Sequence, residues 1–379
     1  MSIKFVEYDS ETIIATLVAQ FEKATGETLQ PSDERRMFLN QLAQVIVGIN
    51  ANINDTGNQV LLRYARGENL DAIGELLGIE RLRASYAKCP LKFTLSAPQT
   101  QNITIPKGTR ATPNGTVYFA TDEMLIIPAG STVGIVNATA TNAGTLNNGF
   151  AIGEIKYIVD NVQYLKSVEN TEVSKSGTEE ESDDSFRERI RLVPESFSTA
   201  GCSDGYIYWA KSASADVGDV VIYSPVNDST LTEEERAAGA GIVKVYILNA
   251  DGNLPSKELI DLVYKSVSAK DRRPLTDKVE VLAPETKKYS INLKYYISSE
   301  DEINATDIER KVDQAVTEYV TWQGSKIGRD INPDKLRNLI LNAGASRIVM
   351  TSPTFLELKD TQVALLDGEI IADLEGVSE

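Results

Sequence analysis

A stripe of apolar residues in the first part of the chain constrains the fold more than any other sequence feature. The stripe consists of Phe38, Leu42, Val45, Ile49 and Ile53, at intervals of four, three, four and four residues. Such intervals place side chains on one face of an α-helix and approach the heptad repeat of helices that pack side by side. The stripe therefore predicts a long helix that buries this face against other helices.

Residues 1–88 follow helical patterns throughout. A first helix is expected between a cap at Ser10 and Gly26, a second segment opens at Pro31, and a short third helix covers Asn69–Leu77. Two partners for the stripe stay open: the remaining helices of this chain, or helices of other chains. The few short helices before residue 89 offer little surface for burying two long apolar faces, which favours other chains.

At Cys89 the pattern changes from helix to strand. Leu91, Phe93 and Leu95 alternate with polar residues, which is the period of a strand with one buried face. Turn residues recur through the segment that follows, so residues 89–175 are predicted to form a β-rich module of short strands. The polar residues 172–185 are expected to be a linker that runs into a helix capped by Ser182 or Asp183, with Asp183 and Arg187 forming an i,i+4 pair.

Strands and helices alternate through the rest of the chain. Residues 176–285 and 286–379 are therefore predicted to be two domains of mixed strands and helices. Residues 227–241 are interpreted as an exposed polar insertion, and Thr306–Glu309 as a capping box that starts a helix. The predicted fold class is α+β and multidomain, with an N-terminal helical segment, a β-rich middle module and mixed α/β C-terminal domains.

Composition excludes several kinds of function. The 379 residues include no histidine and two cysteines, Cys89 and Cys202, so Ser-His-Asp and Cys-His catalysis and the usual zinc sites are excluded. The chain carries 55 acidic against 38 basic residues, a net charge of −17, which argues against nucleic-acid binding. No apolar run is long enough to span a membrane, and the N-terminal residues do not resemble a secretory signal.

The remaining candidates for chemistry have simpler interpretations. The acidic run Glu179–Asp184 could bind a cation, but a solvated linker with a helix cap is favoured. Asp251-Gly252-Asn253 lacks the spacing of a calcium loop and is interpreted as a turn. Arg272 and Arg273 could bind an anion, although such arginines more often pair with acids across an interface.

We therefore predict no catalytic, cofactor-binding or metal-binding residue and no cofactor. The candidate residues for contact with partners are Phe38, Leu42, Val45, Ile49, Ile53, Arg272 and Arg273.

The order of short motifs along nearly the whole chain resembles the baseplate J-like family of contractile phage tails and related injection machines. These motifs include Ala65-Arg66-Gly67, Leu70-Asp71 and Arg81, then Ile105-Pro106-Lys107-Gly108, then Ser182-Asp183, Phe186-Arg187 and Arg189, and finally Asp219-Val220 and Arg272-Arg273-Pro274. Two departures are Val217-Gly218 before the Asp-Val pair, where the family usually has Gly-Val, and the insertion at 227–241.

The resemblance implies a structural wedge component of a baseplate, not an enzyme. Two copies are expected to join one copy of a second wedge protein through a bundle of N-terminal helices. Neighbouring wedges, the central hub or spike and sheath-proximal baseplate proteins are further implied partners, with no nucleic acid and no membrane insertion. The expected location is the baseplate of a virion or of a tail-like particle such as a bacteriocin, assembled in the bacterial cytoplasm. Hinges are expected near residues 86–90 and 170–182.

Two other functions stay open. A receptor-binding or fibre-like tail surface protein would form trimers on its own, and a cell-wall hydrolase would present paired carboxylates in a cleft.

Overall fold

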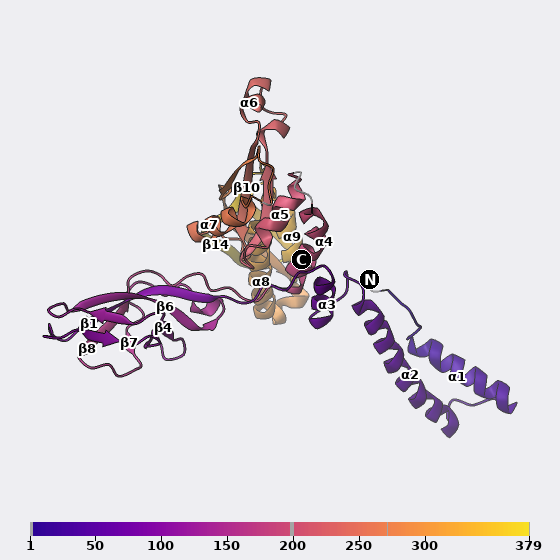
Figure 1. Ribbon diagram of the computed structural model, residues 1–379. Helices are drawn as coiled ribbons and strands as arrows, with labels where there is room; N and C mark the ends of the chain where they lie inside the picture. Colours follow the sequence, from indigo (N-terminus) through magenta and orange to yellow (C-terminus); the bar gives the residue numbers. More distant parts are fainter. Residues whose placement is uncertain (1–2, 198–200, 271, 379) are drawn as a thin grey trace. The chain divides into compact units, whose positions relative to one another are not determined.

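The computed structural model describes residues 3–197, 201–270 and 272–378. It confirms the predicted fold class: helices come first, a β-rich module follows, and mixed sheets with helices end the chain (Figure 1). The chain divides into two compact units, the first comprising Met1–Arg81 with Ser182–Ile190 and the second Leu82–Glu181 with Arg191–Glu379. None of the described helices is long and apolar enough to cross a membrane.

The first unit begins with a pair of helices joined by a short loop. Its helices are α1 (Ser10–Thr25), α2 (Glu34–Gln59), α3 (Glu68–Leu76) and the first part of α4 (Asp183–Ser196). α1 packs on α2 through a small core of Val18, Leu29 and Leu39. The cap of α1 is Asp9 and not Ser10, because the Asp9 carboxylate accepts a hydrogen bond from the Thr12 amide at 2.9 Å. Gly26 ends the helix in the left-handed conformation, as predicted.

The second half of this unit joins residues more than a hundred positions apart. Arg81 Nη2 lies 2.7 Å from both Asp71 Oδ1 and Asp183 Oδ1, and the Phe186 ring lies against its guanidinium. The predicted pair of Asp183 with Arg187 is therefore wrong: Asp183 pairs with Arg81, and Arg187 pairs with Asp184. These contacts fasten the start of α4 beside α3, so the family-like motifs in both segments build one small core.

The second unit begins with the β-rich module. Its strands are β1 (Tyr86–Leu95), β2 (Ile103–Ile105), β3 (Arg110–Thr112), β4 (Phe119–Thr121), β5 (Leu125–Ile127), β6 (Val133–Ala143), β7 (Tyr157–Ile158) and β8 (Leu165–Asn170), with a turn of 3₁₀ helix, η1 (Thr145–Asn147). Six strands form a sheet in the order β7-β3-β4-β6-β1-β8, and β2 pairs with β5. Leu91, Phe93 and Leu95 are buried, which confirms the period-two prediction.

The segment after β8 is not the free linker that the sequence suggested. Lys175 and Thr178 form antiparallel bridges with Lys88 and Ser85 at the start of β1. The Ser182 hydroxyl does accept a hydrogen bond from the Ser185 amide at 3.2 Å, as expected of a helix cap. The polar composition of this segment reflects hydrogen bonding back to the sheet, which composition alone does not reveal.

Two mixed layers, each a three-stranded sheet with its own helices, complete the second unit. The first has a sheet in the order β11-β10-β9 with helices α5 (Ser203–Lys211) and α7 (Lys257–Val267); its strands are β9 (Val217–Tyr223), β10 (Ile242–Asn249) and β11 (Lys278–Leu282). Between β9 and β10 lie η2 (Pro225–Asn227) and α6 (Glu233–Ala238). α6 has no buried residue, as an exposed insertion should.

The second layer has the sheet β13-β12-β14, built from β12 (Glu285–Ser298), β13 (Arg347–Ser352) and β14 (Gln362–Ser378), with η3 (Ser299–Asn304), α8 (Ala305–Gly324) and α9 (Pro333–Asn342). The capping box predicted at Thr306–Glu309 is wrong, because α8 already begins at Ala305, after Asn304. Asn332 caps α9, because its side-chain oxygen accepts a hydrogen bond from the Asp334 amide at 3.0 Å, and Pro333 occupies the first turn. A shared cluster of Leu248, Ile327 and Val363 joins the two layers.

Candidate functional site

The predicted interface residues of α2 are exposed. The exposed fractions are 69% for Phe38, 59% for Val45, 53% for Ile49, 46% for Ile53 and 38% for Leu42. α1 packs instead on a different face of α2, through Leu39. Of the two partners left open for the stripe, the described helices of the first unit therefore do not cover it.

The stripe is long and has no charges around it. Its residues span 15 positions, which is about 22 Å of helix at about 1.5 Å per residue. Between Met37 and Asn54 the helix contains no Asp, Glu, Lys or Arg, although a quarter of the chain is charged. A solvent-exposed helix normally carries charges on its outer face. The absence of charge is therefore a second sequence signal of an interface, which the spacing of the apolar residues does not contain.

Arg272 and Arg273 lie in the second unit and are used within their own layer. The Arg272 guanidinium carbon stacks 4.0 Å from the centre of the Trp209 ring, and its Nη1 donates to the carbonyl oxygen of Ser266 at 3.0 Å. Arg273 Nε donates to the carbonyl oxygen of Ser268 at 3.1 Å. Both guanidinium groups therefore fasten the turn between α7 and β11, and a role in partner contact stays a prediction for them.

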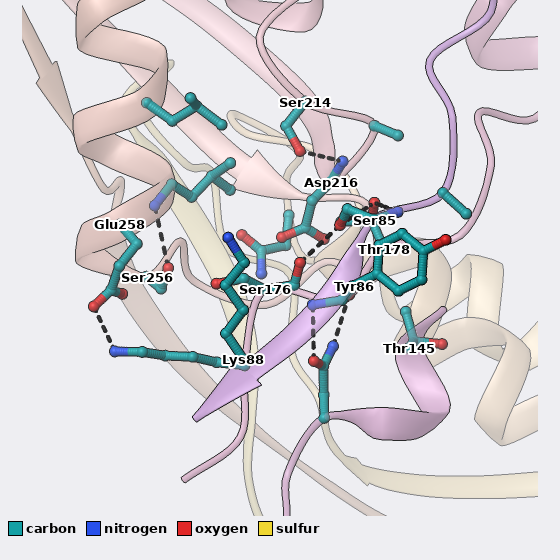
Figure 2. A pocket seen from close by; sticks show the side chains of 18 of the residues that line it. Ser85, Tyr86, Lys88, Thr145, Ser176, Thr178, Ser214, Asp216, Ser256 and Glu258 are labelled. Carbon is teal, nitrogen blue, oxygen red and sulfur yellow. Dashed lines mark hydrogen bonds and ion pairs between the residues drawn. The ribbon is translucent and has the colours of Figure 1, made fainter. Parts of the chain in front are cut away.

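A pocket of about 1080 Å³ lies at the base of the β-rich module, in the second unit. Figure 2 shows that the β-rich module and the segment after it contribute Ser85, Lys88 and Ser176 to its lining, and the following mixed layer contributes Asp216 and Glu258. An ion pair of 2.5 Å between Lys175 Nζ and Glu258 Oε1 crosses from the β-rich module to α7.

Asp216 is an acidic group of this pocket whose pKa is raised. Burial, and after it the neighbouring Asp251, raise the pKa of Asp216 to about 6. Within the described part of the chain no cation pairs with this carboxylate. Ser176, which also lines the pocket, has a φ of 75°, an uncommon conformation for a residue with a side chain.

Neither a Ser-His-Asp arrangement nor a metal site is present among the described residues of this pocket. Its hydroxyl groups have no histidine beside them, and the Ser85 hydroxyl donates to the carbonyl oxygen of Ser176 at 2.7 Å. Among the described residues no group of three His, Cys, Asp or Glu side chains could hold a metal ion. Cys89 is buried, and burial raises the pKa of its thiol to about 12, so that it stays protonated at neutral pH.

The acidic run before α4 serves as a set of hydrogen-bond acceptors within the chain. Glu179 Oε1 accepts from the Thr145 amide at 2.7 Å, and this bond lowers the pKa of Glu179. Glu181 Oε2 accepts from the Leu82 amide at 3.0 Å. The amide of Gly67, followed by Arg81, lowers the pKa of Asp183. The favoured interpretation of these acids as a solvated linker with a helix cap was therefore incomplete, because Glu179, Glu181, Asp183 and Asp184 all have partners within the chain.

Comparison with known proteins gives one consistent result. Three family models match the chain: the Baseplate J-like protein barrel domain at residues 90–177, the Baseplate J-like central domain at 198–283 and the Baseplate J-like protein C-terminal domain at 290–371. Baseplate protein J of Escherichia phage P2 is 26% identical over 174 residues, which are 46% of this chain and 52% of that protein. The chain thus matches about half the length of this curated relative.

A solved structure is also similar. It is the six-fold symmetrised cryo-EM structure of the anti-feeding prophage baseplate, in which a chain has a TM-score of 0.46 and 11% sequence identity to this one, over 94% of this chain and 90% of that chain.

Proposed function

The chain belongs to the baseplate J-like family, and on that premise we propose that it is a structural wedge component of the baseplate of a contractile phage tail or tail-like injection particle. Its role in this proposal is to hold other baseplate proteins in place, without a catalytic step. The three family models together cover more than half of the chain, and this membership supports a baseplate component. The wedge role is proposed in addition to this membership.

The exposed stripe of α2 is the observation that carries the wedge role. Its five side chains still expose about as much apolar surface as two to three fully exposed apolar residues. At about 1.5 to 3 kcal/mol for each fully buried large apolar side chain, a partner helix gains roughly 4 to 8 kcal/mol by covering one stripe, before the entropy cost of association. An uncharged helical face of this length fits the seam of a helical bundle.

The proposed assembly follows from this seam. Two copies of this chain contribute their α2 helices to a bundle with a helix from a second wedge protein, giving a 2:1 wedge. The β-rich module and the two mixed layers provide the surfaces for neighbouring wedges, the hub and sheath-proximal proteins. In this proposal residues 1–88, 89–175, 176–285 and 286–379 act as separate functional parts, and assembly takes place in the bacterial cytoplasm.

Charged substitutions in the stripe test this function. Leu42→Asp and Ile49→Asp each place a carboxylate where the bundle must exclude water, and we expect either change to abolish wedge formation when the chain is co-expressed with its wedge partner. The second unit should keep its unfolding transition in both variants.

Gln44→Asp is the matched control, because Gln44 is an exposed residue of the same helix outside the stripe. It adds the same charge and has a similar effect on helix propensity, and it should leave assembly intact. Normal wedge assembly by the Leu42→Asp and Ile49→Asp variants would contradict the proposal.

A further inference from the structure

A ladder of three asparagines on α2 holds the N-terminal residues of the chain. Asn50, Asn54 and Asn58 follow one another at intervals of four residues and therefore lie along one face of the helix. The non-helical segment 3–7, which precedes α1 in Figure 1, lies against this face. This asparagine ladder is separate from the apolar stripe, which lies on another face of α2.

The ladder pairs with main-chain groups of the segment. Asn58 accepts from the amide of Ile3 at 3.0 Å and donates to the carbonyl oxygen of Ile3 at 2.8 Å. Asn54 does the same with Val6, at 3.0 and 2.8 Å, and also accepts from the amide of Phe5. A carboxamide offers one acceptor and two donors, so it can satisfy both main-chain groups of one residue, as a neighbouring β-strand does.

Burial is concentrated on the ladder and not on the side chains of the segment. Asn54 and Asn58 are 7% and 5% exposed, whereas Ile3 and Phe5 remain 47% and 51% exposed. Because the contacts are mostly to the main chain, the ladder selects the path of a peptide more than its sequence. Without an occupant the two carboxamides would exchange their bonds to the segment for bonds to water, although Asn58 would still donate to the carbonyl oxygen of Asn54 at 2.7 Å. The ladder would therefore remain able to bind a peptide main chain in place of water.

We propose that the asparagine ladder of α2 is a binding site for the main chain of a peptide segment, that residues 3–7 fill it in their own chain, and that the same segment of a second copy can fill it instead. The second copy is the occupant that the geometry favours, because it carries an identical segment on an identical arm. This proposal does not depend on the baseplate role.

The arm that would be exchanged is only lightly held. It comprises the segment and α1, and it is joined to α2 through the loop of residues 26–33. Its contacts with α2 include the small core of Val18, Leu29 and Leu39, the Arg35 guanidinium over the Phe21 ring, and the bonds of the ladder. Exchange of such an arm between two identical chains forms the same contacts in both and requires a change only in the connecting loop.

Binding in trans is the first test. A chain that lacks residues 1–8 is mixed with a fluorescent peptide of residues 1–8, and binding is followed by anisotropy. We expect saturable binding. Methylation of the Val6 amide nitrogen removes the donor to Asn54 and should weaken binding at least tenfold. Methylation at Lys4, whose amide makes no hydrogen bond to the ladder, is the matched control and should change it less than threefold. Equal binding of both methylated peptides, or no binding, overturns main-chain recognition.

A full-length variant covers the case in which the shortened chain does not fold. Asn54→Leu keeps the size of the side chain but removes its hydrogen bonds. We expect hydrogen exchange at the Phe5 and Val6 amides to accelerate at least tenfold, with no change in strand β1. An unchanged rate at these two amides overturns the ladder as the binding element.

Exchange between copies is tested by a disulfide. A Cβ at Gly57 would lie 2.7 Å from Cδ2 of Phe5, so cysteines at these two positions face each other. Chains with Phe5→Cys and chains with Gly57→Cys, both carrying Cys202→Ser, are mixed and oxidised with oxidised glutathione. A covalent dimer that neither variant forms alone is the expected result. If the mixture stays uncrosslinked while the double variant closes its disulfide within one chain, exchange between copies is excluded.

Discussion

Arg81 is expected to stabilise the region around α3 without affecting the stability of the second unit. Its side chain is 12% exposed, its Nε and Nη2 lie 2.9 and 2.7 Å from Asp71 Oδ1, and Nη2 lies 2.7 Å from Asp183 Oδ1. Hydrogen bonds between charged groups contribute about 1.5 to 3 kcal/mol each. Asp71 and Asp183 are themselves 46% and 37% exposed, so water partly replaces the lost bonds and the lower end of this range applies.

Arg81→Met should therefore cost about 3 kcal/mol, from two carboxylate contacts and the stacking on Phe186. Hydrogen exchange in α3 measures this directly, because 1.4 kcal/mol corresponds to about a tenfold change in opening and 3 kcal/mol to about a hundredfold. Arg81→Lys keeps the charge but loses the planar fork, and should give an intermediate acceleration.

Arg66→Met is the matched control. Arg66 also contacts both oxygens of a carboxylate, that of Asp55, but the two side chains are 64% and 51% exposed. An exposed pair of this kind contributes at most about 1 kcal/mol, so exchange in α3 should change less than about fivefold. Equal effects of the two substitutions would refute the reasoning, because burial would then not set the strength of the ion pair. Faster exchange in β1 after Arg81→Met would also refute it, because the two units would then not unfold independently.

Three other predictions concern the second unit. The pKa of Asp216 is about 6 in the folded chain and ordinarily 3.8, so its contribution to stability is full below about pH 4 and is lost as the pH rises through 6. Asp216→Asn should therefore raise the free energy of unfolding in urea by about 1 kcal/mol at pH 8, after allowance for partial exposure, and should not change it at pH 4. A Cβ at Gly218 would lie 2.5 Å from the carbonyl oxygen of Asn249, so Gly218→Ala should lower that free energy by about 1 to 3 kcal/mol, whereas Gly48→Ala, with open space in α2, should not lower it. A thiol reagent should label one cysteine per native chain, Cys202, and two per denatured chain, because Cys89 is 3% exposed; rapid labelling of both in the native chain would contradict its burial.

Local patterns were sufficient to predict the elements but not how distant segments meet. The alternation at Leu91, Phe93 and Leu95 and the cap at Asn332 are readable because each depends on neighbours in the sequence. The contact of Arg81 with Asp183 joins residues 102 positions apart, and no local rule connects them. For the same reason the predicted pair of Asp183 with Arg187 failed, since a third residue competed for the carboxylate.

The candidate interface was only partly readable. The intervals of the stripe predicted a helix with an apolar face, but the same pattern fits a core or a seam, and only the exposure in the structure separates the two. Two further signals were present in the sequence: the uncharged run from Met37 to Asn54, and the regular spacing of Asn50, Asn54 and Asn58, which are poor helix formers in the C-terminal half of α2. Each of these two signals reflects contacts of the helix with other segments.

The mass of the complex formed by this chain tests the central claim most directly. Light scattering coupled to size-exclusion chromatography would be applied to the chain alone and to the chain co-expressed with the neighbouring wedge-type open reading frame. The account predicts a stable complex with two copies of this chain for each partner, which the chain alone does not form. A well-behaved homotrimer that ignores the partner would contradict the wedge role and favour a receptor-binding tail protein.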